Sequence, residues 1–547
     1  MRKKLLLIFL TISSLATFSQ VQRPSTPPKL VLGIVVDQMR YDYLFRYWNK
    51  YGEGGFKRLL KEGHNCENTM YNYVPTYTGP GHASIYSGTT PSVHGIVSND
   101  WYVKKKKKEI YCVSDSTVQP VGTNTAAGKM SPVNLLASNI SDELRLANVK
   151  KSKVIAIALK DRSAILPAGH NANAAYWYDG TTGDFISSSF YVNDLPQWVK
   201  DFNAQKLADK YLSKDWTTLL PIKEYTESIA DSNAYEGLFA GEKNSKFPHQ
   251  LAEIRKYKGY STIAPTPFGS SLTKDLALKA IEKEDLGMDE YPDLLAISFS
   301  SPDYVGHQFG PTSVEVEDTY LRLDRDLAEL LAYTEKKVGK GNVLVFLTAD
   351  HGAVHNAKYL MDNKIPAGRF DSRQIRKELN TYTYENYKDS LVLEVTNQQV
   401  YLDDEKISTL GYAKANVADD LAEIILDYQG VAHTLTARSL QRNEFLQAPF
   451  SLIQKGYYPK RCGDIMINFE PSWLEFPVET GTSHGSPYTY DTHVPLLWWG
   501  WKITPGSNSE ALTITDIAPT LSLILNVPYP NGCTGKPIEK VLDKVKK

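Results

Sequence analysis

The sequence predicts an α/β protein with a mostly parallel central sheet flanked by helices. Short apolar runs with the character of fully buried strands recur along the chain, and helical patterns alternate with them. Strands that alternate with helices are typical of a parallel sheet with helices on its faces. The apolar runs are residues 29–36, 154–159, 294–299, 343–348 and 494–500.

The clearest helical pattern covers residues 314–338, VEVEDTYLRLDRDLAELLAYTEKKV. Apolar side chains recur there at the spacing of one helix face, which indicates an amphipathic helix packed against the sheet. These side chains are Val316, Tyr320, Leu323, Leu327 and Leu330.

Two long regions, residues 165–265 and 360–480, break this alternation. We expect both to be insertions that cap one catalytic domain spanning residues 24–547, rather than independent domains. The lysine run at 104–108 predicts a solvated turn between two short strands. Attraction of anions is the alternative interpretation of that run.

Composition and the N-terminus narrow the class of protein. The 61 basic and 62 acidic residues nearly balance, so we expect no nucleic-acid partner. Residues 1–20 have a basic start, an apolar run and small polar residues, which predicts a signal peptide and a periplasmic or secreted protein. An N-terminal anchor is the alternative. No later stretch reaches about 18 apolar residues, so we expect no stable membrane span.

The four cysteines are too scattered in sequence for a cysteine-type zinc site. Structural disulfides and buried free thiols remain as interpretations, and the sequence does not choose a pairing. The residues are Cys66, Cys112, Cys462 and Cys533.

Charged and metal-binding side chains follow four of the predicted strands. Any one of them alone is an ordinary polar strand end, but four cases in one chain indicate a site. In an open α/β sheet, ligands bind outside the carboxyl ends of the strands. We therefore expect these side chains to share one rim: Asp37, the pair Lys160 and Arg162, Asp303 with His307, and the pair Asp350 and His351.

Carboxylate and imidazole ligands without cysteine suit Zn²⁺, with Mn²⁺ or iron as alternatives. The Asp303 and His307 spacing allows both side chains to turn toward one ion. A further histidine, His484, lies in a loop rich in glycine, serine and threonine, ETGTSHGSP, which leaves it free to reach an ion.

Thr78 lies in the segment TGPGHASIYSG, just before a predicted helix. Gly79 permits an unusual turn and Pro80 suits the start of a helix. Thr78 would then lie at a helix N-terminus, which favours anions. A dication lowers the pKa of a bound hydroxyl and makes it a nucleophile. A simple helix cap is the alternative role.

Several segments together resemble the alkaline phosphatase superfamily: VVDQMRYDYL, YVPTYTGPGHASIYSG, GIVSNDWY, LKDRSAILPAGHN, SSPDYVGHQFGP, TADHGA and ETGTSHGS. The resemblance covers nearly the whole chain after the signal. It implies two Zn²⁺ ions per chain and a covalent phosphothreonine intermediate on Thr78. One ion would be surrounded by Asp37, Thr78, Asp350 and His351, and the other by Asp303, His307 and His484.

The resemblance also implies the substrate. Asn99 resembles the family's asparagine donor to a phosphoryl oxygen, and Lys160 and Arg162 resemble the pair that binds the remaining oxygens. Such a pair favours phosphate monoesters as the small-molecule substrates, so we expect an alkaline phosphatase. A nucleotide pyrophosphatase/phosphodiesterase with the same di-zinc site is the alternative. Family likeness further suggests a monomer.

Overall fold

The structure is a computed structural model that describes residues 26–475 and 479–542. Its centre is a ten-stranded sheet. In order across the sheet, the strands are β19 (Gly506–Asn508), β2 (His64–Cys66), β18 (Leu496–Gly500), β11 (Val343–Thr348), β1 (Leu30–Val36), β10 (Asp293–Phe299), β7 (Val154–Ala158), β8 (Ala174–Asp179), β9 (Asp184–Ser188) and β6 (Pro120–Val121).

The five central strands, β11 to β8, run parallel to one another. At the middle of the sheet, Leu32 of β1 pairs with Leu295 of β10 on one side and Val345 of β11 on the other. Every residue of β1, β10 and β11 is buried, as their continuous apolar sequences require. Antiparallel strands β18 and β9 flank this parallel core. The predicted fold class is therefore confirmed.

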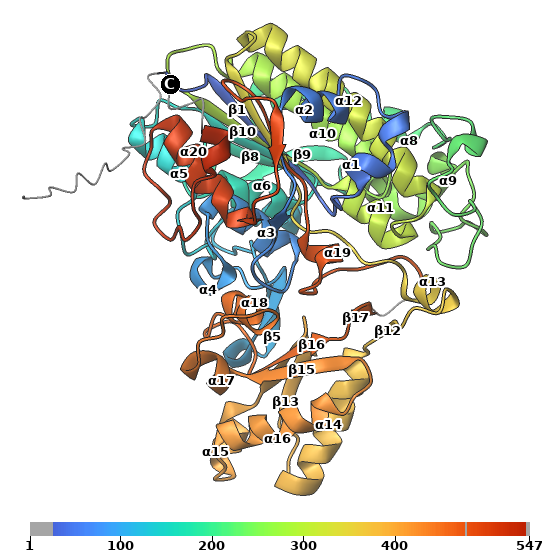
Figure 1. The fold of residues 1–547 in the computed structure, drawn as a ribbon, viewed down its shortest axis with the longest axis vertical. Coiled ribbons are helices and arrows are strands. Elements are labelled where there is room, and N and C mark those ends of the chain that lie inside the picture. The colour runs from blue at the N-terminus through green and yellow to red at the C-terminus, as the bar shows by residue number, and fades with distance from the viewer. Residues whose placement is uncertain (1–25, 476–478, 543–547) are drawn as a thin grey trace, which may run out of the picture.

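Helices cover both faces of the sheet (Figure 1). On one face, α10 (Pro267–Lys283) packs against α12 (Val314–Val338), which has the bounds of the predicted amphipathic helix. On the other face, α3 (Thr78–Ser87) packs against α6 (Asp161–Ala168) and α20 (Ile517–Leu525). Beside these, α5 (Ile140–Ala147) packs against α20.

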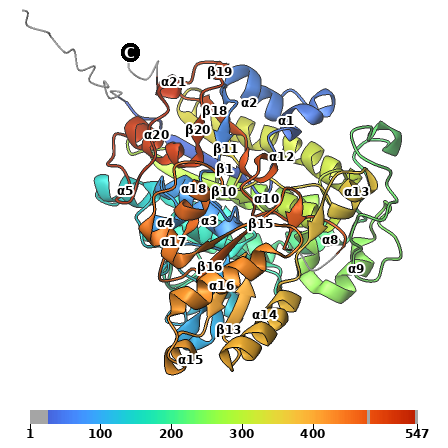
Figure 2. The same ribbon diagram turned by 60° about the horizontal axis from the view of Figure 1, so that its bottom comes forward.

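A second sheet of four strands lies at one end of the molecule, below the main sheet in Figure 1 and at the bottom of Figure 2. Its strands, in order, are β13 (Val392–Thr396), β14 (Gln399–Leu402), β16 (Ile465–Phe469) and β15 (Val431–Thr436). It packs with α14 (Ser372–Tyr387) and α16 (Lys414–Leu426) around a hydrophobic core of its own.

The chain enters and leaves this unit side by side. There, β12 (Gly368–Arg369) pairs with β17 (Trp473–Leu474). We call residues 368–474 the cap. Its bounds lie within the predicted insertion at 360–480.

The other predicted insertion, residues 165–265, requires a correction. Its first part forms β8 and β9, which extend the main sheet. Only the part that follows lies outside the sheet, as α7 (Gln197–Ala204), α8 (Leu207–Leu212) and α9 (Leu251–Lys258). The segment AAYWYD of β8 is rich in aromatic residues and was therefore not recognised as a strand. All six of its residues are buried, as in the other central strands.

The lysine run lies at the tip of a hairpin of β4 (Asp100–Val103) and β5 (Lys108–Tyr111), as the predicted turn requires. All four cysteines are free thiols, and three of them are buried. Residues 1–20, which were predicted to be a signal peptide, lie outside the described part. Within residues 26–475 and 479–542, no helix is both long and apolar enough to cross a membrane.

Candidate functional site

The carboxyl ends of four parallel strands deliver the predicted side chains to one rim. Asp37 directly follows β1, Asp350 follows β11, and Lys160 follows β7. Asp303 lies in the first turn of α11 (Ser301–Phe309), which follows β10. All four side chains are buried. The parallel register of the sheet thus places them at its carboxyl edge.

Asp37, Asp350 and His351 form one compact group in which the potential ligand atoms lie within 4.8 Å of one another. His351 Nε2 is 3.6 Å from Asp37 Oδ1 and 3.7 Å from Asp350 Oδ2. These three atoms are buried and have no hydrogen-bond partner in the described part of the chain. Unpaired buried acceptors of this kind are costly unless a cation binds them.

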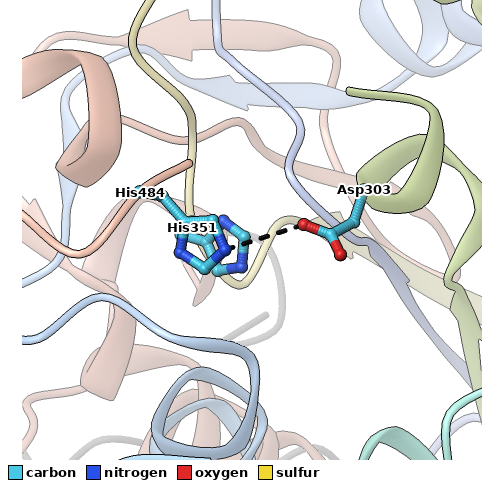
Figure 3. A group of neighbouring side chains, drawn as sticks. All are labelled: Asp303, His351 and His484. Atoms are coloured by element: carbon cyan, nitrogen blue, oxygen red, sulfur yellow. Dashed lines mark ion pairs between the residues drawn. The ribbon is translucent and has the colours of Figure 1, made fainter. Parts of the chain in front are cut away.

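Asp303, His351 and His484 form a second group with the same spacing (Figure 3). His484 Nε2 lies 3.7 Å from Asp303 Oδ1, and the rings of His351 and His484 stack with centroids 3.4 Å apart. His307 Nε2 is 3.1 Å from Asp303 Oδ1. The site therefore contains all three residues predicted for the second ion, but His351 is shared between the two groups.

The three histidines are oriented alike. The Nδ1 atoms of His307, His351 and His484 lie 2.8, 3.0 and 2.6 Å from backbone carbonyl oxygens. A carbonyl accepts the Nδ1 proton and so fixes the tautomer in which Nε2 carries a lone pair. In His351 and His484 this leaves Nε2 as a potential metal ligand. His307 Nε2 instead lies against the Asp303 carboxylate, which outweighs burial and raises the pKa of His307.

Burial sets the protonation of most of these groups. It lowers the pKa of His484 to about 3 and the pKa of His351 well below its usual range, so both imidazoles are neutral. Burial raises the pKa of Asp37 to about 6 and the pKa of Asp350 well above its usual range. For Asp303, burial is outweighed by His307 and Lys160, which lower its pKa. Neutral imidazoles beside destabilised carboxylates form a donor set that fits Zn²⁺.

Thr78 is the first residue of α3 and is 1% exposed. Its Oγ1 lies 3.4 Å from Lys160 Nζ and 3.5 Å from Arg162 Nη2. Gly81 allows α3 to approach the strand ends, because a Cβ at Gly81 would lie 2.7 Å from the backbone oxygen of Asp350. The hydroxyl thus faces two cations beside both carboxylate groups.

The Lys160 ammonium, which was predicted to bind a phosphoryl oxygen, contacts two carboxylates of the site. Its Nζ is 2.7 Å from Asp37 Oδ2 and 2.5 Å from Asp303 Oδ2, so it bridges carboxylates assigned to different ions. Arg162 Nη1 donates to the hydroxyl of Tyr111 over 3.0 Å. These contacts bring both cations of the predicted pair to the same rim.

Asn99 lies beside Thr78. The backbone N–H of Gly79 donates to Asn99 Oδ1 over 2.8 Å, which fixes the carboxamide and leaves its Nδ2 group as the donor. The structure therefore brings every predicted site residue to one place: Asp37, Thr78, Asn99, Lys160, Arg162, Asp303, His307, Asp350, His351 and His484.

Besides Tyr111, two further residues of the site were not predicted. Gln38 donates from its Nε2 to Asp303 Oδ1 over 2.7 Å and from its backbone N–H to Asp350 Oδ1 over 3.1 Å, so it joins the two carboxylate groups. The Tyr304 ring lies over Lys160, whose Nζ is 5.0 Å from the ring centroid. Each directly follows a predicted ligand in sequence, Asp37 or Asp303, and this position was the only feature of the sequence that could have indicated them.

Comparison with known proteins defines the class. A family model described as type I phosphodiesterase / nucleotide pyrophosphatase matches residues 31–487, and the chain belongs to this family. The predicted relation to the alkaline phosphatase superfamily is confirmed by this match and by full-length relatives.

Three relatives match over nearly their whole length. A protein of Myroides odoratus named a calcium-transporting ATPase is 46% identical and covers 94% of this chain and 95% of its own. Alkaline phosphatase PhoV of Synechococcus elongatus is 45% identical, with coverage of 94% and 93%. Alkaline phosphatase PafA of Elizabethkingia meningoseptica is 44% identical over 99% of both chains. The crystal structure of PafA covers 94% of this chain and 99% of its own with a TM-score of 0.92.

Proposed function

We propose that this protein is a secreted di-zinc alkaline phosphatase that hydrolyses phosphate monoesters through a phosphothreonine intermediate on Thr78. The observation that carries the proposal is the position of the Thr78 hydroxyl. It lies beside two buried carboxylate–imidazole groups and within 3.5 Å of Lys160 and Arg162. The names of PhoV and PafA support the same activity.

The assignment of ligands follows the two groups. We assign Asp37, Thr78, Asp350 and His351 to one Zn²⁺, and Asp303, His307 and His484 to the other. Bound there, two dications would activate the threonine hydroxyl and stabilise charge on the entering and leaving oxygens.

The remaining polar groups bind the phosphoryl oxygens. The carboxamide Nδ2 of Asn99, the Lys160 ammonium and the Arg162 guanidinium supply donors to a dianionic group. The hydroxyl of Tyr111 orients the Arg162 guanidinium. Metal ions bound by Asp37 and Asp303 would neutralise these carboxylates in place of Lys160. The Lys160 ammonium would then be able to bind a phosphoryl oxygen of the substrate.

The diesterase alternative has less support. A diester carries one charge less and needs room for a second ester group, so it makes poorer use of Lys160 and Arg162. Hydrolysis of p-nitrophenyl phosphate and bis-p-nitrophenyl phosphate separates the two activities. We expect the monoester to be the better substrate and Lys160→Ala to reduce its kcat/KM more than that of the diester. Equal losses on both substrates would contradict this role of Lys160.

The intermediate is tested by acid quench and mass spectrometry of the wild-type protein and a Thr78→Ala variant. We expect phosphate on Thr78 in the wild type, and no phosphorylation and no turnover in the variant. Thr334→Ala is the matched control, because Thr334 is equally buried and, among the described residues, its hydroxyl donates within α12, to the backbone oxygen of Leu330. Metal analysis should find two zinc ions per chain. Phosphorylation at another residue would refute the assignment.

Export and assembly belong to the same proposal. We propose that residues 1–20 are a cleaved signal peptide and that the catalytic domain, with its cap, acts as a periplasmic or secreted monomer. N-terminal sequencing of the exported protein and light scattering test these points. An intact N-terminus in the mature protein, or a stable dimer, would contradict them.

A further inference from the structure

A cavity of about 660 Å³ lies between the β4–β5 hairpin and the cap. This volume is typical of a small-molecule site. Three aromatic side chains line it: Tyr77 from the segment before α3, Tyr102 from β4, and Phe370 from the cap. Aromatic faces of this kind suit the organic part of a phosphate ester.

The inner wall of the cavity is joined to the active site at three points. Tyr77 directly precedes Thr78, and its ring centroid is 5.5 Å from that of His484. Asn397, which also lines the cavity, donates from Nδ2 to the backbone oxygen of Asp100 over 2.9 Å, next to Asn99. The neighbouring residue of the cap, Gln398, donates to the oxygen of Gly485 over 3.1 Å, next to His484. The cavity therefore lies beside the segments that carry Thr78, Asn99 and His484.

Three cations line the cavity: Lys107 and Lys108 from the hairpin and Arg373 from α14. All three are exposed, and none has an ion pair within the described residues. Lys104, in the same lysine run, is instead paired with Asp464 and Asp404 and so attaches the hairpin to the cap. The lysine run thus both fixes the hairpin and places two ammonium groups at the cavity.

Four carboxylates also line the cavity, and three of them contact other groups of the protein. Asp371 caps α14 by accepting from backbone N–H groups. Glu394 is paired with Arg376, 3.0 Å away. Glu475 accepts from the backbone N–H of Gln398 over 2.6 Å, and burial raises its pKa. Capping leaves the charge of Asp371 in place, so Asp371 and Glu109 are the two exposed carboxylates without a cationic partner in the described structure, and the three cations outnumber them by one.

We propose that this cavity is a leaving-group subsite for phosphate monoesters whose alcohol carries a second anionic group, such as a carboxylate or a further phosphate. The ester's chain or ring lies against Tyr77 and Tyr102, and the second anion binds Lys107, Lys108 and Arg373. This inference rests on the proposed phosphatase activity and adds to it a substrate class.

The test compares ω-carboxyalkyl phosphates of increasing chain length with alkyl phosphates of the same length. At the best length, we expect kcat/KM to favour the carboxylate on the order of tenfold, since three partly exposed ion pairs each contribute about two- to threefold. The ratio should fall toward one at high salt, which screens exposed charges. In the triple variant Lys107→Gln, Lys108→Gln and Arg373→Gln, the ratio should also fall toward one.

Lys105→Gln is the matched control, because Lys105 is exposed in the same run but does not line the cavity. We expect it to preserve the ratio, which would exclude a general effect of surface charge. A ratio near one in the wild type, or an equal loss in the control, would overturn the subsite while alkyl phosphate hydrolysis still supported the phosphatase. Absence of hydrolysis of every monoester would overturn both.

Discussion

Replacement of Asp350 by asparagine should stabilise the metal-free protein while it weakens the proposed zinc site. The Asp350 carboxylate is fully buried and its Oδ2 has no hydrogen-bond partner in the described residues. Burial and the charge of Asp37 raise its pKa well above the usual range. The asparagine side chain would keep the Oδ1 acceptor for the N–H of Gln38 and remove the charge. Burial of this ionisable carboxyl, either as a charge or by its protonation, costs about 1–3 kcal/mol or more, and this cost would be relieved.

The expected change in stability is large enough to be measured by thermal unfolding. An unfolding entropy of about 2.1 cal/mol/K per residue gives about 1.1 kcal/mol/K for 547 residues, so the metal-free Tm should rise by about 1–3 °C. Zinc at a hundredfold excess over its Kd stabilises a protein by about 2.7 kcal/mol per site. Asp350→Asn removes a ligand and should lose much of this gain. The order of stability should therefore invert between protein treated with chelator and protein supplied with zinc.

Asp293→Asn is the control for this inversion. Asp293 is also buried and its pKa is raised to about 6, but both of its oxygens accept backbone N–H groups, from Lys153 at 2.6 Å and Gly287 at 2.8 Å. This variant should destabilise the protein with or without zinc. If Asp350→Asn behaved in the same way, or if zinc stabilised it as much as the wild type, the assignment of Asp350 as a metal ligand would be wrong.

Three further changes test the structure elsewhere. His249 lies between Glu242 and Glu315 at 3.0 and 3.2 Å, which raises its pKa to about 9. The charged His249 side chain therefore stabilises the folded protein. This stabilisation is complete below the unfolded pKa of about 6.5 and is lost as the pH rises through about 9. The urea midpoint should therefore fall more steeply with pH in the wild type than in His249→Gln. Asn139→Ala removes the capping box of α5 and should cost about 1–2 kcal/mol in urea unfolding. Tyr111→Phe frees the Arg162 guanidinium and should lower kcat/KM for p-nitrophenyl phosphate severalfold without changing stability by more than about 1 kcal/mol.

The central sheet was predictable because its strands are buried on both faces. The apolar runs at 29–36, 154–159 and 343–348 correspond to β1, β7 and β11 within a residue or two. The edge strands were not predictable in this way. A strand such as β19, with the sequence GSN, forms through pairing with β2 and carries no pattern of its own.

The cap shows a second limit of sequence reasoning. Its strands pair in the order β13–β14–β16–β15, and residues 403–430 and 437–464 separate members of this sheet in sequence. A polar segment mixed with one helical pattern predicts little about such pairing. The cavity beside the hairpin depends on this arrangement, because Lys108 of the hairpin and Arg373 of the cap are far apart in sequence and meet only in the folded chain.

The candidate site was also predictable only in part. The residues that gather at the rim follow from the strand ends, because parallel strands lie only about 4.8 Å apart and share a carboxyl edge. The long side chain of Lys160, which follows β7, reaches Asp303 in the helix after the neighbouring strand β10 and Asp37 after β1, one strand further. Backbone positions therefore determine which groups meet. Which carboxylate each cation neutralises, and which group His351 joins, depends on the balance of buried charge, and a list of strand ends does not contain that balance.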